Sequence, residues 1–484
     1  MERRDFLQKA GAQVAVAWFV SQGWRPLSAL GDWGDPQPEL TQDLAKFLGE
    51  YVLVPGNAKY EDHRISYASR FQGKPAWLAL CRSTDDVIEC IKAAQRYGVA
   101  LHVRSGGHSY EGLSTGPGLL VDLSLMNTID DFDKAAKTAV IGPGTRLGKV
   151  YEYFAPYGLA LTAGTCPTVG VAGLTLGGGH GFLTRMYGLT CDNLIEADLV
   201  SATGTVHTVR ANATNELDRD LFWACRGGGG GSLGIVTRFK FQLHTAGKTA
   251  RCRMFWPDAA QAIKAWQKFA PKAPNGMASA LNVTSGEAHS NHVMLGDEAT
   301  LRTIMEPIRK AAGATAKYTE GTYYDIMKIF FGNDTRTAPF KASSDYFNAP
   351  LDDKAIARLL AASRSGPGAL LFEAYGGAVD RIKLADSAFA HRGALFCIQY
   401  FSGSASAASL NWVKSMRTAM APYSAGAYVN YTDLDIGKND FSLPSGGASA
   451  FEKAYFGSNI AKLKKIKAAV DPNNFFRHAQ SIRA

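Results

Sequence analysis

Residues 103–112 read VRSGGHSYEG and place a histidine directly behind two glycines. They continue the short apolar run VALHVR, which predicts that the glycines form a turn at the end of a strand. Glycine leaves the backbone unobstructed, so successive N–H groups in such a turn can approach an anionic ligand closely. The stretch therefore predicts a site for a pyrophosphate group with an imidazole beside it.

The residues around this turn predict alternating strands and helices. Residues 76–104 read strand, helix, strand, with a Ser/Thr cap before the helix and Gly98 after it. Residues 194–209 predict a β-hairpin. By contrast, residues 160–181 are rich in Gly and Thr without helical periodicity and predict an extended loop. Residues 427–435, AYVNYTDLD, also predict an extended segment.

Length and composition predict two domains. A chain of 484 residues exceeds one ordinary core, and 46% apolar residues are enough for sizeable buried cores. The glycines cluster at 105–118, 164–181 and 227–234. Beyond residue 246 the predicted strands and helices alternate without such clusters, which indicates a second, α+β domain over 246–420.

Several other ligand classes do not fit the motifs. The glycines at 227–234 contain G-x-G-x-x-G, but a helix precedes them and a strand follows, the reverse of the order in a dinucleotide-binding unit. GPGTRLGKV at 142–150 has Pro143 and Val150 where a P-loop has Gly and Ser/Thr. The seven cysteines form no C-x-x-C pair, so no metal cluster is expected.

The positive charge does not indicate nucleic-acid binding. The net charge is +9, but the basic residues are scattered apart from KLKKIK at 462–467. That run lies on a single helix predicted over 451–472 and resembles its solvated face. No aromatic and basic module accompanies it, so we expect no nucleic-acid partner.

The N-terminus predicts export. Arg3 and Arg4 precede AGAQVAVAWFV, an apolar run too short to span a bilayer. The pattern resembles a twin-arginine signal over residues 1–30, with an ordinary amphipathic helix as the alternative. We therefore expect a periplasmic or secreted protein that the export machinery carries across the membrane already folded.

Taken in order, the motifs resemble those of one family. The chain contains RSGGHSYEG, GTCPTVGVAGLTLGGGHG, YGLTCDN, FWACRGGGGGSLGIVT, FEAYGG, YVNYTDLD and DPNNFFRHAQSI. Over residues 50–484 it resembles the berberine-bridge-enzyme-like oxidases of the vanillyl-alcohol-oxidase flavoprotein superfamily. This resemblance implies a two-lobed α+β fold. An FAD-binding domain of the vanillyl-alcohol-oxidase type spans 40–245, a substrate-binding domain with an antiparallel sheet spans 246–420, and a C-terminal segment at 421–484 returns to the FAD domain.

The resemblance implies FAD held by two covalent bonds. His108 matches the histidine that bonds to the flavin 8α-methyl carbon, and Cys166 matches the cysteine that bonds to flavin C6. Val169 matches an oxygen-gatekeeper position, where valine resembles the oxidases and leucine the dehydrogenases. The other residues implied to bind the cofactor are Arg104, Ser105, Gly106, Gly107, Ser109, Gly170, Gly173, Gly178, Gly179, Gly181, Gly234, Ile235, Val236 and Asn430.

The resemblance also implies catalytic tyrosines. Tyr428 and Tyr431 match a C-terminal motif that approaches the flavin. Because alternate residues of a strand share a face, an extended segment would turn Tyr431 away from Tyr428, and we expect Tyr428 to be the catalytic base. Gln399 matches a position that carries a glutamate base in alkaloid-converting members. Glutamine there resembles the carbohydrate and alcohol oxidases.

Three further residues complete the implied catalytic set. Glu373 matches a position that carries a carboxylate in some sugar oxidases. His180 stands where plant members have a tyrosine beside the flavin, and Tyr110 matches a tyrosine of the active-site wall. Cys397 departs from the lysine often found at its position, so the pKa-tuning role of that lysine does not carry over to this chain.

These residues together imply an exported FAD oxidase. It would convert an alcohol or a sugar hemiacetal to a ketone or lactone and reduce O2 to H2O2. The first alternative is oxidation of a non-sugar natural product such as a polyketide or phenolic. The others are a flavin-holding binding protein without turnover and a carbohydrate-binding wall protein with a vestigial site. We expect a small-molecule substrate, a monomer and no bound metal.

Overall fold

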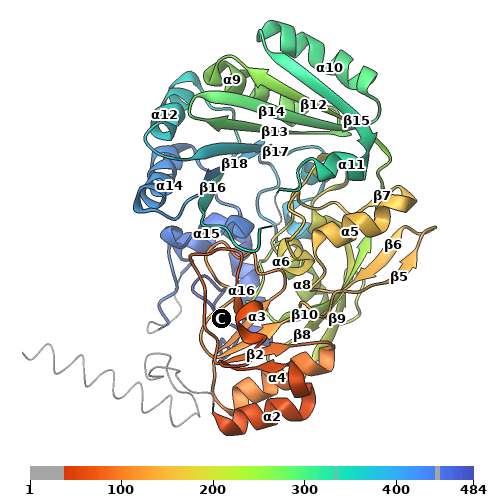
Figure 1. The fold of residues 1–484 in the computed structure, drawn as a ribbon, viewed down its shortest axis with the longest axis vertical. Coiled ribbons are helices and arrows are strands. Elements are labelled where there is room, and N and C mark those ends of the chain that lie inside the picture. The colour runs from red at the N-terminus through yellow and green to blue at the C-terminus, as the bar shows by residue number, and fades with distance from the viewer. Residues whose placement is uncertain (1–36, 333–334, 442–446) are drawn as a thin grey trace, which may run out of the picture.

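The computed structural model describes residues 37–332, 335–441 and 447–484. The twin-arginine-type segment at residues 1–30 therefore lies outside the described residues. Figure 1 shows two lobes, with a large antiparallel sheet and its helices at the top and the smaller sheets below. Helices and antiparallel sheets are combined in both lobes, as the α+β prediction requires.

The N-terminal part of the lower lobe contains the strand, helix, strand unit that the sequence predicts. Helix α4 begins where the Ser83 hydroxyl accepts a hydrogen bond from the N–H of Asp86. Strand β4 pairs in parallel with both β2 and β3, and the Ser-Gly-Gly-His turn follows directly where β3 ends. The elements of this part are α2 (Pro38–Leu48), β1 (Val52–Leu53), α3 (Tyr60–Arg64), β2 (Trp77–Leu80), α4 (Thr84–Arg96), β3 (Leu101–Arg104) and β4 (Leu119–Asp122).

The rest of the lower lobe is built on a five-stranded antiparallel sheet in the order β5-β6-β10-β8-β9. Strands β8 and β9 form the hairpin predicted at 194–209. Strand β10 buries Phe239 and Phe241 on one face, as its alternating sequence predicts. The elements are β5 (Ile129–Asp133), β6 (Thr138–Ile141), α5 (Leu147–Phe154), β7 (Leu159–Ala160), α6 (Val171–Leu176), α7 (Thr184–Tyr187), β8 (Leu194–Val200), β9 (Val206–Arg210), α8 (Glu216–Ala224), β10 (Ile235–Gln242) and β11 (His244–Thr245).

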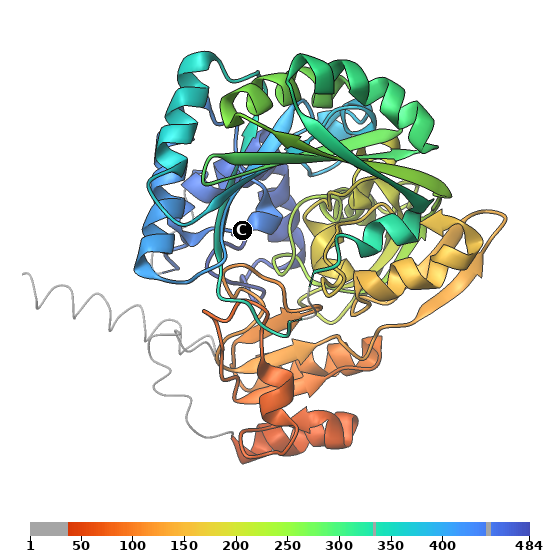
Figure 2. The same cartoon turned by 45° about the horizontal axis from the view of Figure 1, so that its top comes forward.

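The upper lobe is a seven-stranded antiparallel sheet in the order β15-β12-β14-β13-β17-β18-β16. Helices α9, α10, α12 and α14 cover the face that points away from the lower lobe (Figures 1 and 2). Phe372 and Ala374 of β17 lie in the core under these helices, so Glu373 between them faces the lower lobe. The elements are β12 (Lys248–Trp256), α9 (Ala259–Phe269), β13 (Met277–Thr284), β14 (Glu287–Leu295), α10 (Glu298–Ala311), β15 (Thr315–Thr322), α11 (Tyr323–Lys328), β16 (Lys341–Phe347), α12 (Asp353–Ser363), β17 (Ala369–Ala374), α13 (Ala378–Arg381), β18 (Phe396–Ser402) and α14 (Ala407–Met420).

The C-terminal segment packs against the lower lobe. Helices α15 (Ala450–Phe456) and α16 (Ile460–Val470) contribute to the same buried cluster as α8 and β10. The prediction of one continuous helix here is wrong, because Gly457 adopts φ +51° and divides it. The solvated-face interpretation of the basic run fails at Lys467, whose side chain is fully buried.

Two segments that the sequence predicts as extended contain helical turns. Helix α6 forms inside the Gly/Thr-rich stretch, where the burial of Val171, Ala172 and Thr175 outweighs weak helix propensity. Residues 427–435 form 3₁₀ turns at Val429–Tyr431 and Leu434–Ile436 instead of a strand. Strand alternation therefore cannot be used to separate the two candidate tyrosines.

The described residues contain neither a membrane-spanning helix nor a cluster of metal ligands. None of their helices is both long enough and apolar enough to cross a membrane. Nor do they hold any group of three or more His, Cys, Asp or Glu side chains placed to bind a metal ion.

Candidate active site

Two glycine-containing loops touch backbone to backbone in the lower lobe. A Cβ atom on Gly106 would lie 2.2 Å from the Gly170 nitrogen, and one on Gly170 would lie 2.1 Å from Ser105 Oγ. Gly107 adopts φ +73°, a left-handed conformation that side chains disfavour. The loop after β3 and the loop before α6 can therefore meet only because glycines stand at these positions.

His108 and Cys166 converge on one hydroxyl group. His108 Nε2 lies 3.0 Å from Thr168 Oγ1, and Cys166 Sγ lies 3.5 Å from the same oxygen. The ring of Tyr67 stacks on His108 with centroids 4.0 Å apart. Burial, with a smaller effect of nearby Arg146, lowers the pKa of His108 to about 4. The imidazole is therefore neutral at neutral pH, and one ring nitrogen keeps a lone pair.

The surroundings fit an additional group at this place. The Ser66 hydroxyl is buried and has no hydrogen-bond partner among the described residues. It precedes Tyr67, whose N–H donates to the Gly107 carbonyl oxygen. A Cβ on Gly173 of α6 would meet no atom within 4 Å. A bound cofactor could supply the missing hydrogen-bond partner of the Ser66 hydroxyl and could occupy the open space beside Gly173.

A second cluster forms where β17, β18 and the 429–431 turn meet. Tyr431 Oη donates a 2.8 Å hydrogen bond to Glu373 Oε1, and the ring of Tyr431 stacks on Tyr110 with centroids 5.4 Å apart. Gln399 Nε2 donates to Tyr110 Oη at 2.8 Å. His180 Nδ1 lies 3.8 Å from Glu373 Oε1. The structure thus brings together five of the six predicted catalytic residues.

The sixth residue, Tyr428, is hydrogen-bonded to the glycine loop at residues 177–181. Its Oη accepts hydrogen bonds from the Gly179 N–H at 2.8 Å and from Asn430 Nδ2 at 3.0 Å. Its ring nevertheless contacts Tyr431 in a T-shaped arrangement with centroids 4.9 Å apart. Both tyrosines point toward the same region, contrary to the strand-based prediction that they face apart.

Both phenols are hard to ionise. Burial first, and the Glu373 carboxylate second, raise the pKa of Tyr431 well above its ordinary value of 10. Burial also raises the pKa of Tyr428, although the hydrogen bonds from Gly179 and Asn430 act in the opposite direction. A tyrosine of this cluster that takes up a proton must therefore hand its own proton to an acceptor.

Other predicted cofactor residues have scaffold roles in this structure. Arg104 is buried, and its Nε donates to Asp122 Oδ2 at 2.7 Å. Ser105 Oγ donates to the Pro143 carbonyl at 2.6 Å, and Ser109 Oγ accepts from the Leu113 N–H at 2.9 Å. Gly178, Gly181, Gly234, Ile235, Val236 and Val169 are packed against neighbouring protein atoms.

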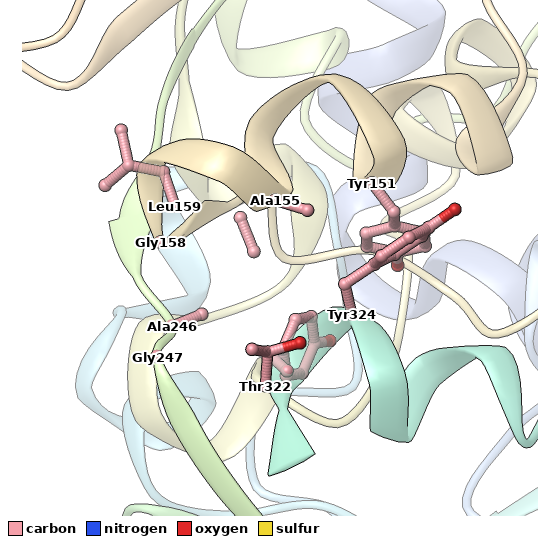
Figure 3. Close-up of a pocket in the computed structure, with 10 residues that line it drawn as sticks. Tyr151, Ala155, Gly158, Leu159, Ala246, Gly247, Thr322 and Tyr324 are labelled. Carbon is pink, nitrogen blue, oxygen red and sulfur yellow. The ribbon is translucent and has the colours of Figure 1, made fainter.

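A separate small cavity lies where α5 meets α11 (Figure 3). Its volume is about 40 Å³, which is room for no more than a few water molecules. Tyr151 lines it and donates a 2.7 Å hydrogen bond to the Gly164 carbonyl, two residues before Cys166. None of the ten lining residues is a predicted site residue. This cavity is too small to be the substrate site.

Comparison with known protein families agrees with this geometry. Residues 75–210 match the FAD binding domain model, and residues 427–483 match the model named berberine and berberine like. Berberine bridge enzyme-like 24 of Arabidopsis thaliana is 31% identical over 466 residues, covering 86% of this chain and 85% of that protein. The chain belongs to the berberine-bridge-enzyme-like family. An uncharacterized FAD-linked oxidoreductase of Bacillus subtilis is 30% identical over 446 residues, covering 89% of this chain and 96% of that protein.

Solved structures of similar proteins confirm the fold. A chitooligosaccharide oxidase is 29% identical with a TM-score of 0.83, covering 92% of this chain and 99% of that chain. The grass pollen allergen Phl p 4, which has glucose dehydrogenase activity, is 28% identical with a TM-score of 0.82 and the same coverage. An isoleucine-to-valine variant of that allergen is a glucose oxidase. This berberine-bridge-enzyme-like protein is an FAD-linked oxidoreductase with an α+β fold of the vanillyl-alcohol-oxidase type.

Sequence reasoning missed three residues that shape this oxidoreductase's site. Thr168 lies between Cys166 and Val169, and only its place inside the TCPTVG motif could have drawn attention to it. Tyr67 precedes the matched motifs and carries no signal. Tyr375 stacks on His180 with centroids 4.7 Å apart and donates or accepts a 2.9 Å hydrogen bond with Tyr346.

Proposed function

We propose that this oxidoreductase is an exported oxidase that converts a sugar hemiacetal or another secondary alcohol to a lactone or ketone, with O2 as the acceptor. The observation that carries the proposal is the hydrogen bond from Tyr431 Oη to Glu373 Oε1. In this hydrogen bond the phenol of Tyr431 already has an acceptor for its own proton. The same cluster contains Gln399, which is a neutral side chain. The sugar oxidases among its structural relatives support a carbohydrate substrate.

The proton chemistry follows from the hydrogen bonds. Removal of a hydride from an alcohol carbon requires the O–H proton to leave as well. FAD, when bound, supplies the hydride acceptor and the path of the electrons to O2. Tyr431 stays protonated at neutral pH because burial and Glu373 raise its pKa. Its oxygen would take the substrate proton while its own proton passes to Glu373, so the two residues work as a relay.

Tyr428 takes the supporting role in this scheme, which exchanges the roles that the sequence predicted. Its oxygen already accepts two hydrogen bonds, from Gly179 and Asn430, and its side chain is buried. Within the described part of the chain, no carboxylate accepts its proton. We therefore assign Tyr428 to holding the glycine loop and Tyr431 to the proton transfer.

The cofactor would be held by His108 and Cys166. Their reactive atoms share Thr168 as a neighbour, and the neutral imidazole has a free lone pair. The flavin 8α-methyl group and C6 are both on the benzene ring of the flavin, so two side chains that bond to them must lie close together. His108 and Cys166 meet this condition because both contact the Thr168 hydroxyl.

A substrate panel tests the function. Purified protein is mixed anaerobically with glucose, cellobiose and chitobiose, with simple secondary alcohols, and with phenolic and polyketide aglycones. Bleaching of the flavin by a sugar, followed by H2O2 on admission of air, supports the proposal. Bleaching by aglycones alone would favour the natural-product alternative. A flavin that no compound bleaches would indicate a binding protein without turnover.

We expect Val169 to control access of O2. Val169 lies three residues after Cys166, and its N–H donates to the Cys166 carbonyl oxygen at 3.4 Å. In Val169→Leu the larger side chain should slow reoxidation of the reduced flavin by O2 and leave its anaerobic reduction nearly unchanged. Stopped-flow absorbance measures both steps. Equal reoxidation rates in the variant and the wild type would remove Val169 from the oxygen path.

We also propose export of the folded protein through the twin-arginine route. Arg3 and Arg4 precede the apolar run, as in such signals. The double replacement Arg3→Lys with Arg4→Lys should leave the protein in the cytoplasm with its flavin bound. Cell fractionation followed by flavin fluorescence measures this. Normal export of the double variant would show that another route is used.

A further inference from the structure

The edge strand of the upper sheet holds the catalytic turn at both ends. Ser344 Oγ of β16 accepts a 3.0 Å hydrogen bond from the Tyr428 N–H. Three residues earlier on the same strand, Lys341 Nζ donates to Asp433 Oδ1 at 2.6 Å. Tyr431 lies between these two attachment points. The strand therefore fixes the position of the turn from which Tyr431 projects.

Lys341 also reaches the loop that carries the other stacked tyrosine. Its Nζ donates to Glu111 Oε1 at 2.9 Å, and Glu111 directly follows Tyr110. Arg70 Nη2 donates to the same Glu111 oxygen at 2.7 Å. One ammonium group thus joins the two segments whose tyrosine rings stack on each other.

This network is buried, and its carboxylates differ in how many cations compensate them. The side chains of Lys341 and Glu111 are each 3% exposed, and that of Asp433 is 1% exposed. Asp435 lies 3.2 Å from Lys341, but its side chain is 46% exposed, so water can solvate its charge. Glu111 keeps Arg70 if Lys341 is lost. Asp433 does not have a second cation in this network.

Asp433 depends on Lys341 for its charge compensation. Its Oδ1 also accepts a hydrogen bond from the Asp435 N–H, but its Oδ2 has no partner among the described residues. An unpaired buried carboxylate is costly, so without Lys341 this side chain would shift, take up a proton or draw in water. Asp433 is two residues from Tyr431, so such a change reaches the tyrosine through a very short length of chain.

We propose that Lys341 is a positioning residue for the oxidation: it sets Tyr431 against Tyr110 and within hydrogen-bonding distance of Glu373. The proposal rests on the proposed function in taking Tyr431 as the proton-transferring residue. The ammonium group of Lys341 contacts Glu111, Asp433 and Asp435 and acts on Tyr431 only through them. Its effect is on the rate of the chemical step, because displacing a catalytic group by about 1 Å can cost about 10²-fold.

Two variants separate positioning from plain stability. Lys341→Arg keeps a cation beside Asp433 and should retain most of the rate. Lys341→Met combined with Asp433→Asn removes the tether without leaving a buried charge unpaired, so the protein should fold. The rate constant of anaerobic flavin reduction at saturating sugar should fall by about 10- to 100-fold in this double variant. The dissociation constant of the sugar should change much less.

Lys467→Met combined with Asp471→Asn is the matched control, because it too removes both charges of a buried ion pair. Lys467 is equally buried and pairs with Asp471 at 2.5 Å, but it lies on α16 and contacts neither tyrosine segment. It should lower thermal stability and leave the reduction rate of the folded protein near that of the wild type. A double variant at Lys341 and Asp433 that reduces its flavin at the wild-type rate would overturn the proposal, as would a control that is slowed equally.

Crystal structures of the wild type and of this double variant give a readout that needs no turnover. The hydrogen bond from Tyr431 to Glu373 should be lengthened or broken in the double variant and kept in Lys341→Arg. Kinetics would use whichever of glucose, cellobiose and chitobiose reduces the wild type fastest. If neither these sugars nor the simple secondary alcohols of the panel reduce it, the proposed function fails, and the crystal structures alone decide the role of Lys341. An unmoved Tyr431 in the double variant would refute that role.

Discussion

Replacing Tyr431 by phenylalanine should slow anaerobic flavin reduction by about 10²- to 10⁴-fold, the usual range for loss of general acid–base catalysis. The corresponding rise in the barrier is about 3–5 kcal/mol. The phenylalanine ring can still stack on Tyr110, so substrate binding should change little. Stopped-flow measurement of the reduction rate against sugar concentration separates the two effects.

Two further variants test which residue accepts the proton of Tyr431. Glu373→Gln keeps the size of the side chain but removes the carboxylate that accepts the Tyr431 proton at 2.8 Å. It should cause a loss of similar order, and Tyr431→Phe in that background should add little, because the two residues act as one relay. Tyr428→Phe is the control, since its oxygen is an acceptor for Gly179 and Asn430. If Tyr428→Phe is the more damaging change, the assignment of the two tyrosines is inverted.

The sequence was sufficient to predict which residues form the site, but not which of them contact one another. Resemblance placed Glu373, Gln399 and Tyr110 in one site although they come from three separate parts of the chain. Which tyrosine is hydrogen-bonded to Glu373 depends on the backbone conformation between Tyr428 and Tyr431. The segment YVNYTD carries no turn signal such as Gly or Pro, so it resembled a strand but folds as a 3₁₀ turn held from outside by β16.

Lys341 shows a second limit of sequence reasoning. A lysine at the start of a strand is ordinarily exposed, and buried lysines are rare. Its burial follows from carboxylates that lie 230 and 92 residues away in sequence. Lys467, which the basic run around it made look solvated, is buried against Asp471 four residues away and the Ser232 carbonyl 235 residues away. Long-range pairing of charges leaves no periodic trace in a single sequence.

The variant that combines His108→Ala with Cys166→Ala should lose all covalently bound flavin. Each attachment forms with loss of two hydrogens, one from the side chain and one from the ring system, and O2 can accept the electron pair. Either single variant retains one of the two partners around Thr168 and should keep its flavin through one bond. After acid precipitation, the flavin of the double variant should be in the supernatant, whereas that of the wild type and both single variants should stay with the pellet.

Cys225→Ala is the matched control for this experiment. Cys225 is a buried cysteine of the same lobe, and burial raises the pKa of its thiol to about 12, so it offers no thiolate to a ring carbon. Cys166 is more exposed, and its Sγ contacts the hydroxyl group that His108 also contacts. The intact mass of the wild type and of the Cys225 variant should each include one FAD. Release of the wild-type flavin by acid would show that the convergence at Thr168 serves only to pack the two loops.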